Sequence, residues 1–253
     1  MTAAIRRAGV TNTIVRINVS RTGKATLIGR IPRGTRNPLV EINFADNRLS
    51  GASGSYVNAY YTTGARYVRN AINAVTKRYG YRIINAVSHS MGNLEFINYI
   101  RRYHNAKDFP AIAHWVSMAG HYDGIVGVND EPNRTKVDAR TGRPSRMEPE
   151  YHALLNLRNT FPRQTRVLNI FGNLENGTNS DGDITNASAR SLRYLINGRS
   201  RSYRELMIRG RGGQHSRLHN NAQVNRALVG DKLLSNYRHK LTVVAFLFVK
   251  YLH

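Results

Sequence analysis

Short apolar runs that alternate with longer helix-patterned segments limit the folds open to this chain. Each run is too short for an ordinary helix and is rich in β-branched or other apolar residues, which is typical of a buried strand. The runs read YRIINAVS (81–88), AIAHWVSMAG (111–120), RVLNIFGN (166–173) and YRELMIRG (203–210). The segment GNLEFINYIRRYH (92–104) between the first two has helical spacing. Strands that alternate with helices predict right-handed crossovers and a mostly parallel sheet flanked by helices, that is, an α/β fold.

The residues before this pattern predict an antiparallel hairpin, a further strand and a long helix. TIVRINVS (13–20) and ATLIGRI (25–31) alternate apolar and polar residues on either side of the turn RTGK, as the strands of a β-hairpin do. LVEINFAD (39–46) is the further strand. From 54 to about 78 the apolar spacing predicts one amphipathic helix, which a C-cap glycine at Gly80 ends.

Length and composition favour a single domain over residues 1–253. A chain of 253 residues with 41% hydrophobic residues can bury one substantial core, and no repeat or linker divides it. The stretch from Gly120 to Glu150 is polar, and loops of this length in compact domains are usually functional or mobile. We expect it to cap a binding site together with EYHALLNLRNTF (150–161). LTVVAFLFVKYL (241–252) is too short to span a bilayer and predicts a buried helix.

The chain is strongly basic. It has 38 Lys and Arg against 15 Asp and Glu, a formal net charge of +23. Such a surface attracts anions in general, including nucleic acid, anionic lipid and wall polymers. The arginines are scattered in twos, and no RNP box, zinc knuckle or helix-turn-helix pattern accompanies them. The charge therefore predicts non-specific association with polyanions or anionic surfaces, and no specific nucleic-acid partner.

Several other classes of chemistry lack support in the sequence. The absence of cysteine excludes disulfides and thiolate nucleophiles. His114, His121 and His152 lack metal-ligand spacing, so we predict no metal and no cofactor. The amino terminus MTAAIRRAGV has charge but no apolar core behind it, so we expect no signal peptide in the chain as it stands, and localisation stays open.

The string AVSHSMGN (86–93) places a hydroxyl between small residues at the junction of a predicted strand and a predicted helix. A G-x-S-x-G elbow holds a nucleophilic serine on such a sharp turn, where larger flanking side chains would collide with the strand and the helix. Ser90 has the nucleophile position, and Ser88 replaces the first glycine. The plain alternative is that Ser90 only caps the helix.

A nucleophilic serine needs a base and the base needs an orienting acid, and the chain offers both after later predicted strands. Asp181 or Asp183 follows RVLNIFGN, in the segment GTNSDGDITNASARSL. His215 or His219 follows YRELMIRG, in the segment RGGQHSRLHNNAQVNRAL. Open parallel sheets bind their ligands beyond the carboxyl ends of the strands, so we expect these groups and Ser90 to converge at that edge.

INAVSHSMGN, SDGDITNASARSL and HSRLHNNAQVNRAL, in this order, resemble an α/β-hydrolase family of cell-surface hydrolases from Gram-positive bacteria, long catalogued as a domain of unknown function. Members of that family have a G-H-S-M-G-G elbow, an S-D-G-x-V segment before a helix and an H-S-x-L-H-x-N segment near the end. The last segment also resembles small bacterial lipases. VSRTGKATLIGRI and PLVEINFADN resemble the family's lead-in to the long helix, so the similarity covers roughly residues 12 to 229.

The resemblance implies the α/β-hydrolase fold and a serine hydrolase of carboxylesterase or lipase type, which acts through an acyl-enzyme on a small-molecule or lipid ester. In this sequence Ser90 matches the nucleophile. His215 matches the general base in preference to His219, and Asp181 matches the acid better than Asp183.

The groups around the reacting atoms can be assigned in the same way. The backbone N–H of Met91, which follows the nucleophile, is the expected oxyanion donor. The candidate substrate-binding residues are His89, Tyr122 and Asp123.

The chain departs from the family pattern at the elbow and at its start. Ser88 and Asn93 stand where the family has glycines. Family members begin with a strand that ends in a His-Gly-rich loop, which donates a second oxyanion N–H, whereas this chain begins MTAAIRRAGVTNT. We expect either an N-terminally truncated version with an exposed sheet neighbour, or another segment in the donor's place. Loss of one donor lowers the rate about 10²- to 10³-fold.

Two alternatives to an active hydrolase therefore stay open. One is a weakly active or inactive hydrolase-fold protein. The other is a basic protein that binds polyanions or nucleic acid, in which the Ser-His-Ser string is incidental.

Overall fold

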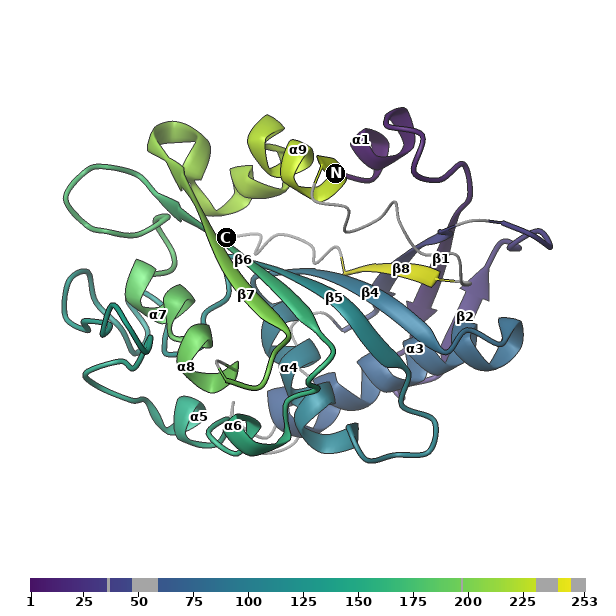
Figure 1. Ribbon diagram of the computed structural model, residues 1–253, viewed down its shortest axis with the longest axis horizontal. Helices are drawn as coiled ribbons and strands as arrows, with labels where there is room; N and C mark the ends of the chain where they lie inside the picture. The colour runs from purple at the N-terminus through teal and green to yellow at the C-terminus, as the bar shows by residue number, and fades with distance from the viewer. Residues whose placement is uncertain (36, 47–58, 197, 231–240, 247–253) are drawn as a thin grey trace.

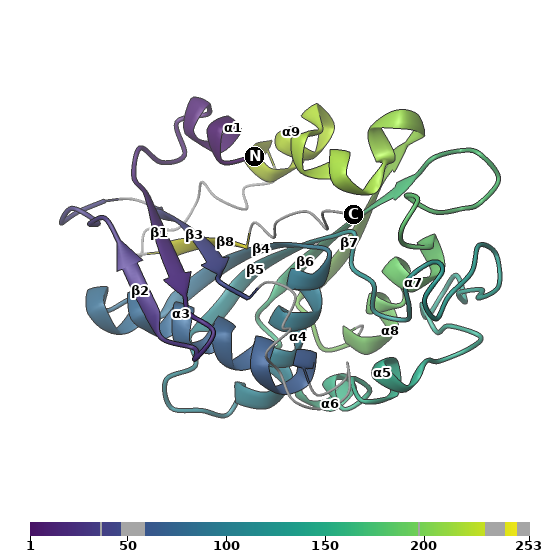
Figure 2. The same ribbon diagram turned by 180° about the vertical axis from the view of Figure 1, so that it is seen from behind.

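The computed structural model describes residues 1–35, 37–46, 59–196, 198–230 and 241–246, and its strands form one sheet between two layers of helices (Figures 1 and 2). The strands are β1 (Ile14–Val19), β2 (Ala25–Ile28), β3 (Leu39–Phe44), β4 (Ile83–His89), β5 (Ala111–Met118), β6 (Arg166–Asn173), β7 (Ser202–Arg209) and β8 (Leu241–Phe246). The α-helices are α1 (Thr2–Arg7), α3 (Ala65–Tyr79), α4 (Met91–Tyr103), α5 (Pro149–His152), α6 (Leu157–Thr160), α7 (Asn186–Arg190), α8 (Leu192–Ile196) and α9 (Ala222–Gly230). The π-helix η1 (Ala59–Gly64) and the 3-10 helices η2 (Gly210–Gly213) and η3 (His215–Asn220) complete the elements.

The strands lie in the order β2-β1-β3-β8-β4-β5-β6-β7 across the sheet. β1 and β2 pair antiparallel, and every other neighbouring pair is parallel. The predicted hairpin and the predicted mostly parallel sheet are thereby confirmed. Since β4, β6 and β7 run in the same direction, the segments that follow them emerge at one edge of the sheet.

The carboxyl-terminal apolar segment is a strand in the middle of the sheet, so the helix predicted for 241–252 is wrong. Its residues 241–246 form β8, and 247–252 lie outside the described residues. β8 pairs with β3 on one side (Leu39 opposite Val243) and with β4 on the other (Ile83 opposite Leu241). The expected exposed sheet neighbour is also wrong, because β8 covers the facing edges of both strands. A short continuous apolar run has no periodicity that separates a buried strand from a buried helix.

The helix predicted for 54–78 is α3, which is shorter at its start. The turn before α3 is the π-helix η1, and 54–58 lie outside the described residues. The predicted end is confirmed, because Gly80 adopts a left-handed conformation with φ 71° and its N–H bonds to the carbonyl of Thr76. A side chain is strained in that conformation, which is why glycine commonly ends helices in this way.

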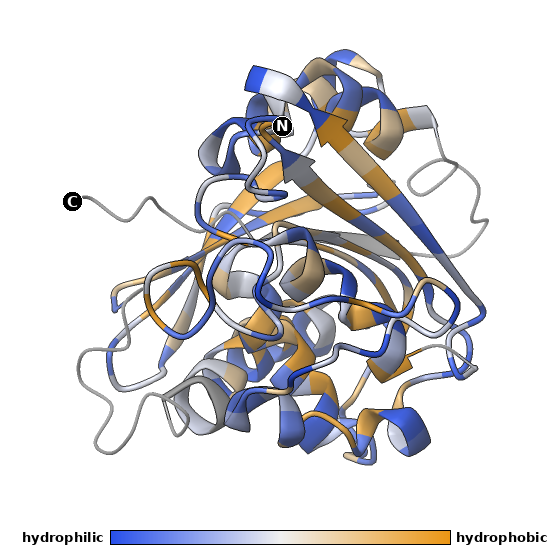
Figure 3. Ribbon diagram, turned by 90° about the vertical axis from the view of Figure 1, so that its left-hand side faces the viewer, coloured by the Kyte–Doolittle hydropathy of each residue, from blue (hydrophilic) through white to orange (hydrophobic). Residues whose placement is uncertain are grey.

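Apolar side chains cover both faces of the sheet. On one face α3, α4, α5, α6 and α8 pack against the strands, and on the other face α1 and α9 do so (Figure 1). Successive residues of β5 alternate between the two layers, with Trp115 facing the first and Val116 the second. Orange apolar stretches lie along the strands in Figure 3, and much of the loop chain is blue or white. A parallel sheet buried on both sides explains the continuous apolar runs in the sequence.

We predict that β8 is required for a cooperative fold. A chain that ends at residue 240 leaves β3 and β4 with unpaired edges in the centre of the sheet, whereas a chain that ends at Phe246 keeps the whole ladder. We expect the shorter chain to aggregate or to melt at least ~10 °C lower, which corresponds to a loss of about 2.5–5 kcal/mol for a chain of this size. Thermal unfolding followed by circular dichroism compares the two chains. Equal melting temperatures would contradict the role given to β8.

Candidate active site

Ser90 lies on a strained turn between β4 and α4. Its φ of 51° and ψ of −123° are rare for a residue with a side chain. Two hydrogen bonds hold the turn: the Ser90 N–H donates to the carbonyl of Met118 over 3.0 Å, and Asn93 Nδ2 donates to the Ser90 carbonyl over 3.1 Å. The Ser90 side chain makes no capping bond to α4, so the helix-cap alternative does not describe it. This is the geometry of a nucleophile elbow, which turns the hydroxyl out over the edge of the sheet.

The two residues that replace glycines at the elbow are bonded to each other. Ser88 Oγ donates to Asn93 Oδ1 over 2.6 Å and accepts from Trp115 Nε1 over 2.8 Å. Asn93 Nδ2 also donates to the carbonyl of Met118 over 2.7 Å. Ser88 and Asn93 are both fully buried. The substitutions thus tie the end of β4 to the first turn of α4, and they leave the elbow intact.

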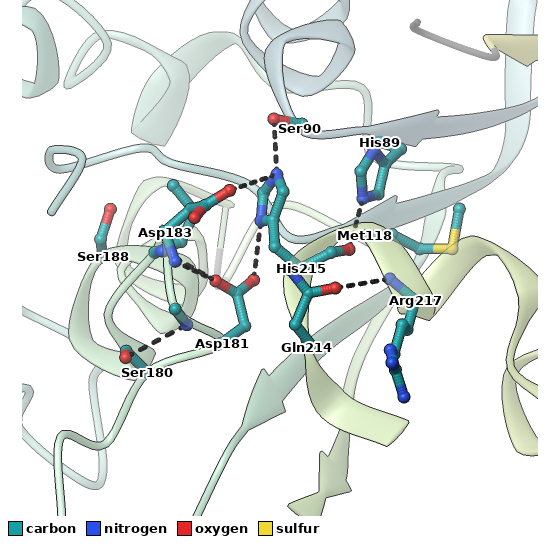
Figure 4. Close-up of polar contacts among 12 residues, drawn as sticks. His89, Ser90, Met118, Ser180, Asp181, Asp183, Ser188, Gln214, His215 and Arg217 are labelled. Carbon is teal, nitrogen blue, oxygen red and sulfur yellow. Dashed lines mark hydrogen bonds and ion pairs between the residues drawn. The ribbon is translucent and has the colours of Figure 1, made fainter. Parts of the chain in front are cut away.

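His215 joins the Ser90 hydroxyl to Asp181 (Figure 4). His215 Nε2 lies 2.9 Å from Ser90 Oγ, and Nδ1 lies 2.9 Å from Asp181 Oδ2. With Nδ1–H donating to the carboxylate, Nε2 is left to accept the serine proton. Asp181 Oδ1 accepts the N–H groups of Asp183 over 3.0 Å and Ile184 over 2.7 Å, which fixes the carboxylate in its loop.

Of the paired alternatives, Asp181 and His215 make these contacts, and the other two lie elsewhere. Asp183 lies on the Nε2 side of the ring, with Oδ2 3.9 Å from Nε2. The ring of His219 packs edge-on against His89, with centroids 5.5 Å apart. The structure therefore brings together the three groups that the family motifs match, from loops that follow β4, β6 and β7.

Two glycines let the loops of Asp181 and His215 approach each other. A Cβ built on Gly172, near the end of β6, would lie 1.7 Å from the carbonyl oxygen of Gly213 and 2.9 Å from the Cβ of Asp181. Only glycine fits such a backbone contact. Beside it the His215 N–H donates to the Asp181 carbonyl over 2.9 Å. The backbone contact thus sets the spacing of the imidazole and the carboxylate.

Burial and neighbouring charges shift the pKa of His215 in opposite directions. Burial lowers the pKa of His215, but the hydrogen bond to Asp181 and the charges of Asp181 and Asp183 outweigh burial, so the pKa lies above its usual value. The neighbouring His89 and His121 are fully buried, and burial together with the charge of His215 lowers the pKa of each to about 3. The two neighbours are neutral at physiological pH, which leaves His215 as the titrating imidazole of this group.

The three candidate substrate-binding residues are buried and bonded within the protein. His89 Nε2–H donates to the carbonyl of His215 over 3.0 Å. The Tyr122 hydroxyl lies 2.7 Å from Ser117 Oγ. Asp123 Oδ1 accepts the N–H of Glu148 over 2.8 Å. As substrate contacts these residues stay predictions.

The insertion from 120 to 150 folds back against the loop that carries Asp181. Asp123 holds its two ends together through Glu148, and burial, followed by the charges of neighbouring carboxylates, raises the pKa of Asp123 to about 7. The Val126 N–H donates to the carbonyl of Asp183 over 2.9 Å. The insertion therefore borders the site, and its role as a cap over substrate stays a prediction.

The described part of the chain offers neither a metal site nor a membrane-spanning helix. Among the described residues no group of three or more His, Cys, Asp or Glu side chains is arranged to hold a metal ion. None of the helices within those residues has the length and apolar character needed to cross a membrane.

The motif analysis missed the residues that support the site. Trp115, Gly172 and Gly213 lie within the apolar runs and the His215 segment, but no motif assigns them a role, although they hold the elbow and the two loops in place. A signal was present in one case: Ser88 and Asn93 depart from the family pattern together, and a paired departure indicates contact. No such signal marks the glycine pair, because sequence spacing does not reveal which backbones touch.

We predict that Ser88 and Asn93 are energetically coupled. Ser88→Ala leaves the buried Asn93 Oδ1 and Trp115 Nε1 without their partner, which costs about 1–3 kcal/mol of unfolding free energy. Asn93→Ala removes bonds to two carbonyls as well and costs at least as much. The double variant loses less than the sum of the two, by about 1 kcal/mol. Urea unfolding of the four proteins measures the coupling, and additive losses would contradict the pairing.

Solved structures of two other proteins share the fold of this chain. The product of the gene lin2722 from Listeria innocua has a TM-score of 0.76 at 17% identity, over 98% of this chain and 94% of that one. The "putative cell surface hydrolase" from Lactobacillus plantarum WCFS1 has a TM-score of 0.68 at 22% identity, over 94% of this chain and 87% of that one. At these identities the likeness shows the fold. None of the curated proteins matches the chain.

A family profile extends the likeness to the sequence itself. The profile described as "Alpha/beta hydrolase of unknown function (DUF915)" matches residues 1–236. The expected α/β-hydrolase fold and the resemblance drawn from the three motifs are confirmed by this match. Because the match covers nearly the whole chain, the protein belongs to this family of alpha/beta hydrolases.

Proposed function

We propose that the protein is a serine hydrolase that cleaves carboxylic esters through an acyl-enzyme. The observation that carries the proposal is the continuous chain of hydrogen bonds from Ser90 Oγ through His215 to Asp181, with both distances at 2.9 Å. Nucleophile, base and orienting acid are the three groups that this chemistry needs, and they lie at the carboxyl edge of the sheet. Small-molecule or lipid esters are the substrate class.

In the first half of the reaction Ser90 Oγ attacks the ester carbonyl carbon while His215 Nε2 takes its proton. Asp181 holds Nδ1–H and stabilises the imidazolium that forms. The tetrahedral intermediate then expels the alcohol, and Nε2–H returns the proton to the leaving oxygen. The acyl group stays on Ser90 as an ester.

In the second half a water molecule replaces the alcohol. His215 Nε2 takes a proton from the water as its oxygen attacks the acyl carbon, and the proton then passes to Ser90 Oγ as the acid departs. The raised pKa of His215 suits it to hold a proton in each intermediate.

The oxyanion of each intermediate needs a donor, and the Met91 N–H is the one that the sequence supplies next to the nucleophile. Met91 begins α4, and the N–H groups of a first helical turn have no partner within the helix. The partial positive charge of a helix amino terminus adds to the stabilisation of an anion there. With one assigned donor, the expected rate is below that of a two-donor site by about 10²- to 10³-fold.

We predict that a fluorophosphonate probe labels the wild-type protein and not Ser90→Ala. The probe reacts with serines whose proton a neighbouring base removes, and His215 lies in contact with the Ser90 hydroxyl. Ser200→Ala is the matched control, since Ser200 lies in the loop before β7, at the amino ends of the parallel strands and away from the site at their carboxyl ends. Labelling that persists in Ser90→Ala, or that is absent from the wild type, would contradict the proposal and favour an inactive hydrolase-fold protein.

We predict that kcat/KM rises with pH through a pKa above the usual 6.5 of histidine. The base must be neutral to accept the serine proton, and the charges and hydrogen bond of Asp181 hold the pKa of His215 high against the effect of burial. In Asp181→Asn the pKa-raising bond and charge are weakened while burial remains, so the rising limb moves to lower pH.

The same variant loses kcat by about 10⁴-fold, because an asparagine favours the wrong imidazole tautomer. The pH profile of hydrolysis of p-nitrophenyl esters measures both effects. A rising limb at the same pH in both proteins would show that Asp181 does not contact the base in solution.

A further inference from the structure

A second carboxylate lies beside the reacting nitrogen of His215. Asp183 Oδ2 is 3.9 Å from Nε2, the atom that contacts Ser90 Oγ, whereas Asp181 contacts the opposite ring nitrogen (Figure 4). The Asp183 side chain is 56% exposed, while that of Asp181 is 1% exposed. Asp183 is therefore open to solvent at the point where a substrate approaches Ser90 and Nε2.

The main chain fixes Asp183 in this position. Its N–H donates to Asp181 Oδ1 over 3.0 Å, and its carbonyl accepts from the Val126 N–H of the insertion over 2.9 Å. Gly182, with φ of 106°, makes the turn between the two aspartates. The loop that orients the base thus also presents Asp183 beside Nε2.

No basic side chain neutralises Asp183 within the described part of the chain. Other carboxylates there have such partners: Asp108 pairs with Arg69 and Lys77, and Glu205 pairs with Arg190. Asp183 has its ion-pair contact with His215 alone among the described residues, in a chain with 38 Lys and Arg against 15 Asp and Glu. A free carboxylate at this place leaves a negative charge for a ligand.

The chemistry of ester cleavage indicates which part of a substrate meets this charge. Nε2–H returns its proton to the leaving oxygen, so the leaving alcohol lies next to Nε2 and within reach of Asp183. We propose that Asp183 is a specificity-determining residue, which favours esters whose leaving alcohol carries a positive charge, such as amino-alcohol esters. This assignment rests on the proposed serine-hydrolase function.

The size of the effect follows from the distance and the exposure. Two unit charges about 4–5 Å apart in a solvated setting change binding about fivefold. Salt weakens an exposed pair of this kind, since the screening length falls to about 3 Å at 1 M. The preference is therefore modest, and it depends on ionic strength.

The test compares two esters of one acid, the choline ester and its uncharged isostere, the 3,3-dimethylbutyl ester. The acid is the one whose p-nitrophenyl ester the wild type hydrolyses fastest. We expect the ratio of kcat/KM for the charged over the uncharged ester to fall about fivefold in Asp183→Asn and also in the wild type at 1 M salt. Glu131→Gln, which removes a charge from an exposed position of the insertion, should keep the wild-type ratio.

Two results would overturn the assignment. If the ratio is the same in Asp183→Asn and the wild type, the carboxylate does not act on the leaving group, and equal slowing of both esters would assign its effect to a step that the two esters share. If the wild type hydrolyses no ester and takes no fluorophosphonate label, the proposed function fails, and the assignment of Asp183 fails with it. If the wild type is labelled normally but the ratio of kcat/KM is unchanged in Asp183→Asn, only the assignment of Asp183 fails.

Discussion

The backbone contact between Gly172 and Gly213 is the constraint on which the candidate site depends. It brings the end of β6 against the loop after β7, so that two segments 34 residues apart present a carboxylate and an imidazole at 2.9 Å. A hydrogen bond between side chains alone would not hold two loops at this spacing, because each side chain has its own rotamers. The backbone bond from the His215 N–H to the Asp181 carbonyl fixes both residues at once. The orientation of the imidazole is therefore a property of the sheet and its loops.

Backbone and side-chain hydrogen bonds also fix the position of Ser90 at the elbow. Ser90 adopts a strained conformation, and strain of this kind persists only where the surroundings over-determine it. Here the surroundings are the bonds from Asn93 and to the Met118 carbonyl, together with the buried pair of Ser88 and Asn93. A family with glycines at these two positions leaves room at the elbow, whereas this chain fills that room with two polar groups that satisfy each other. The paired change keeps buried polar atoms bonded, which explains how the turn survives it.

The sequence was most informative where a pattern is local. Alternation and apolar runs identified β1 to β7. Chain order pointed to Ser90, to Asp181 or Asp183 and to His215 or His219, and the family motifs selected Asp181 and His215 from these alternatives. The sequence failed for β8, because a run of six residues, five of them apolar, carries no period. Its position in the sheet depends on β3 and β4, which lie about 150 to 200 residues earlier in the chain. It also failed for the supports of the site, since a contact between two glycines leaves no pattern. Local periodicity and short motifs can be predicted from the sequence, whereas contacts between segments far apart in the chain cannot.

The overall charge and the local charge at the site act over different distances. The predicted association with anionic surfaces and polyanions rests on the formal net charge of +23, which acts on the molecule as a whole. At physiological salt that attraction fades beyond about 8 Å, so a group bound at the site is governed by its nearest charges. Those charges are Asp181 on one ring nitrogen of His215 and Asp183 near the other. In the proposed ester cleavage both carboxylates favour the imidazolium, and the proposed role of the exposed one is to act on the leaving group. The predicted attraction to anionic surfaces and the proposed preference for a cationic leaving group are therefore compatible, because they depend on charges at different distances from the site.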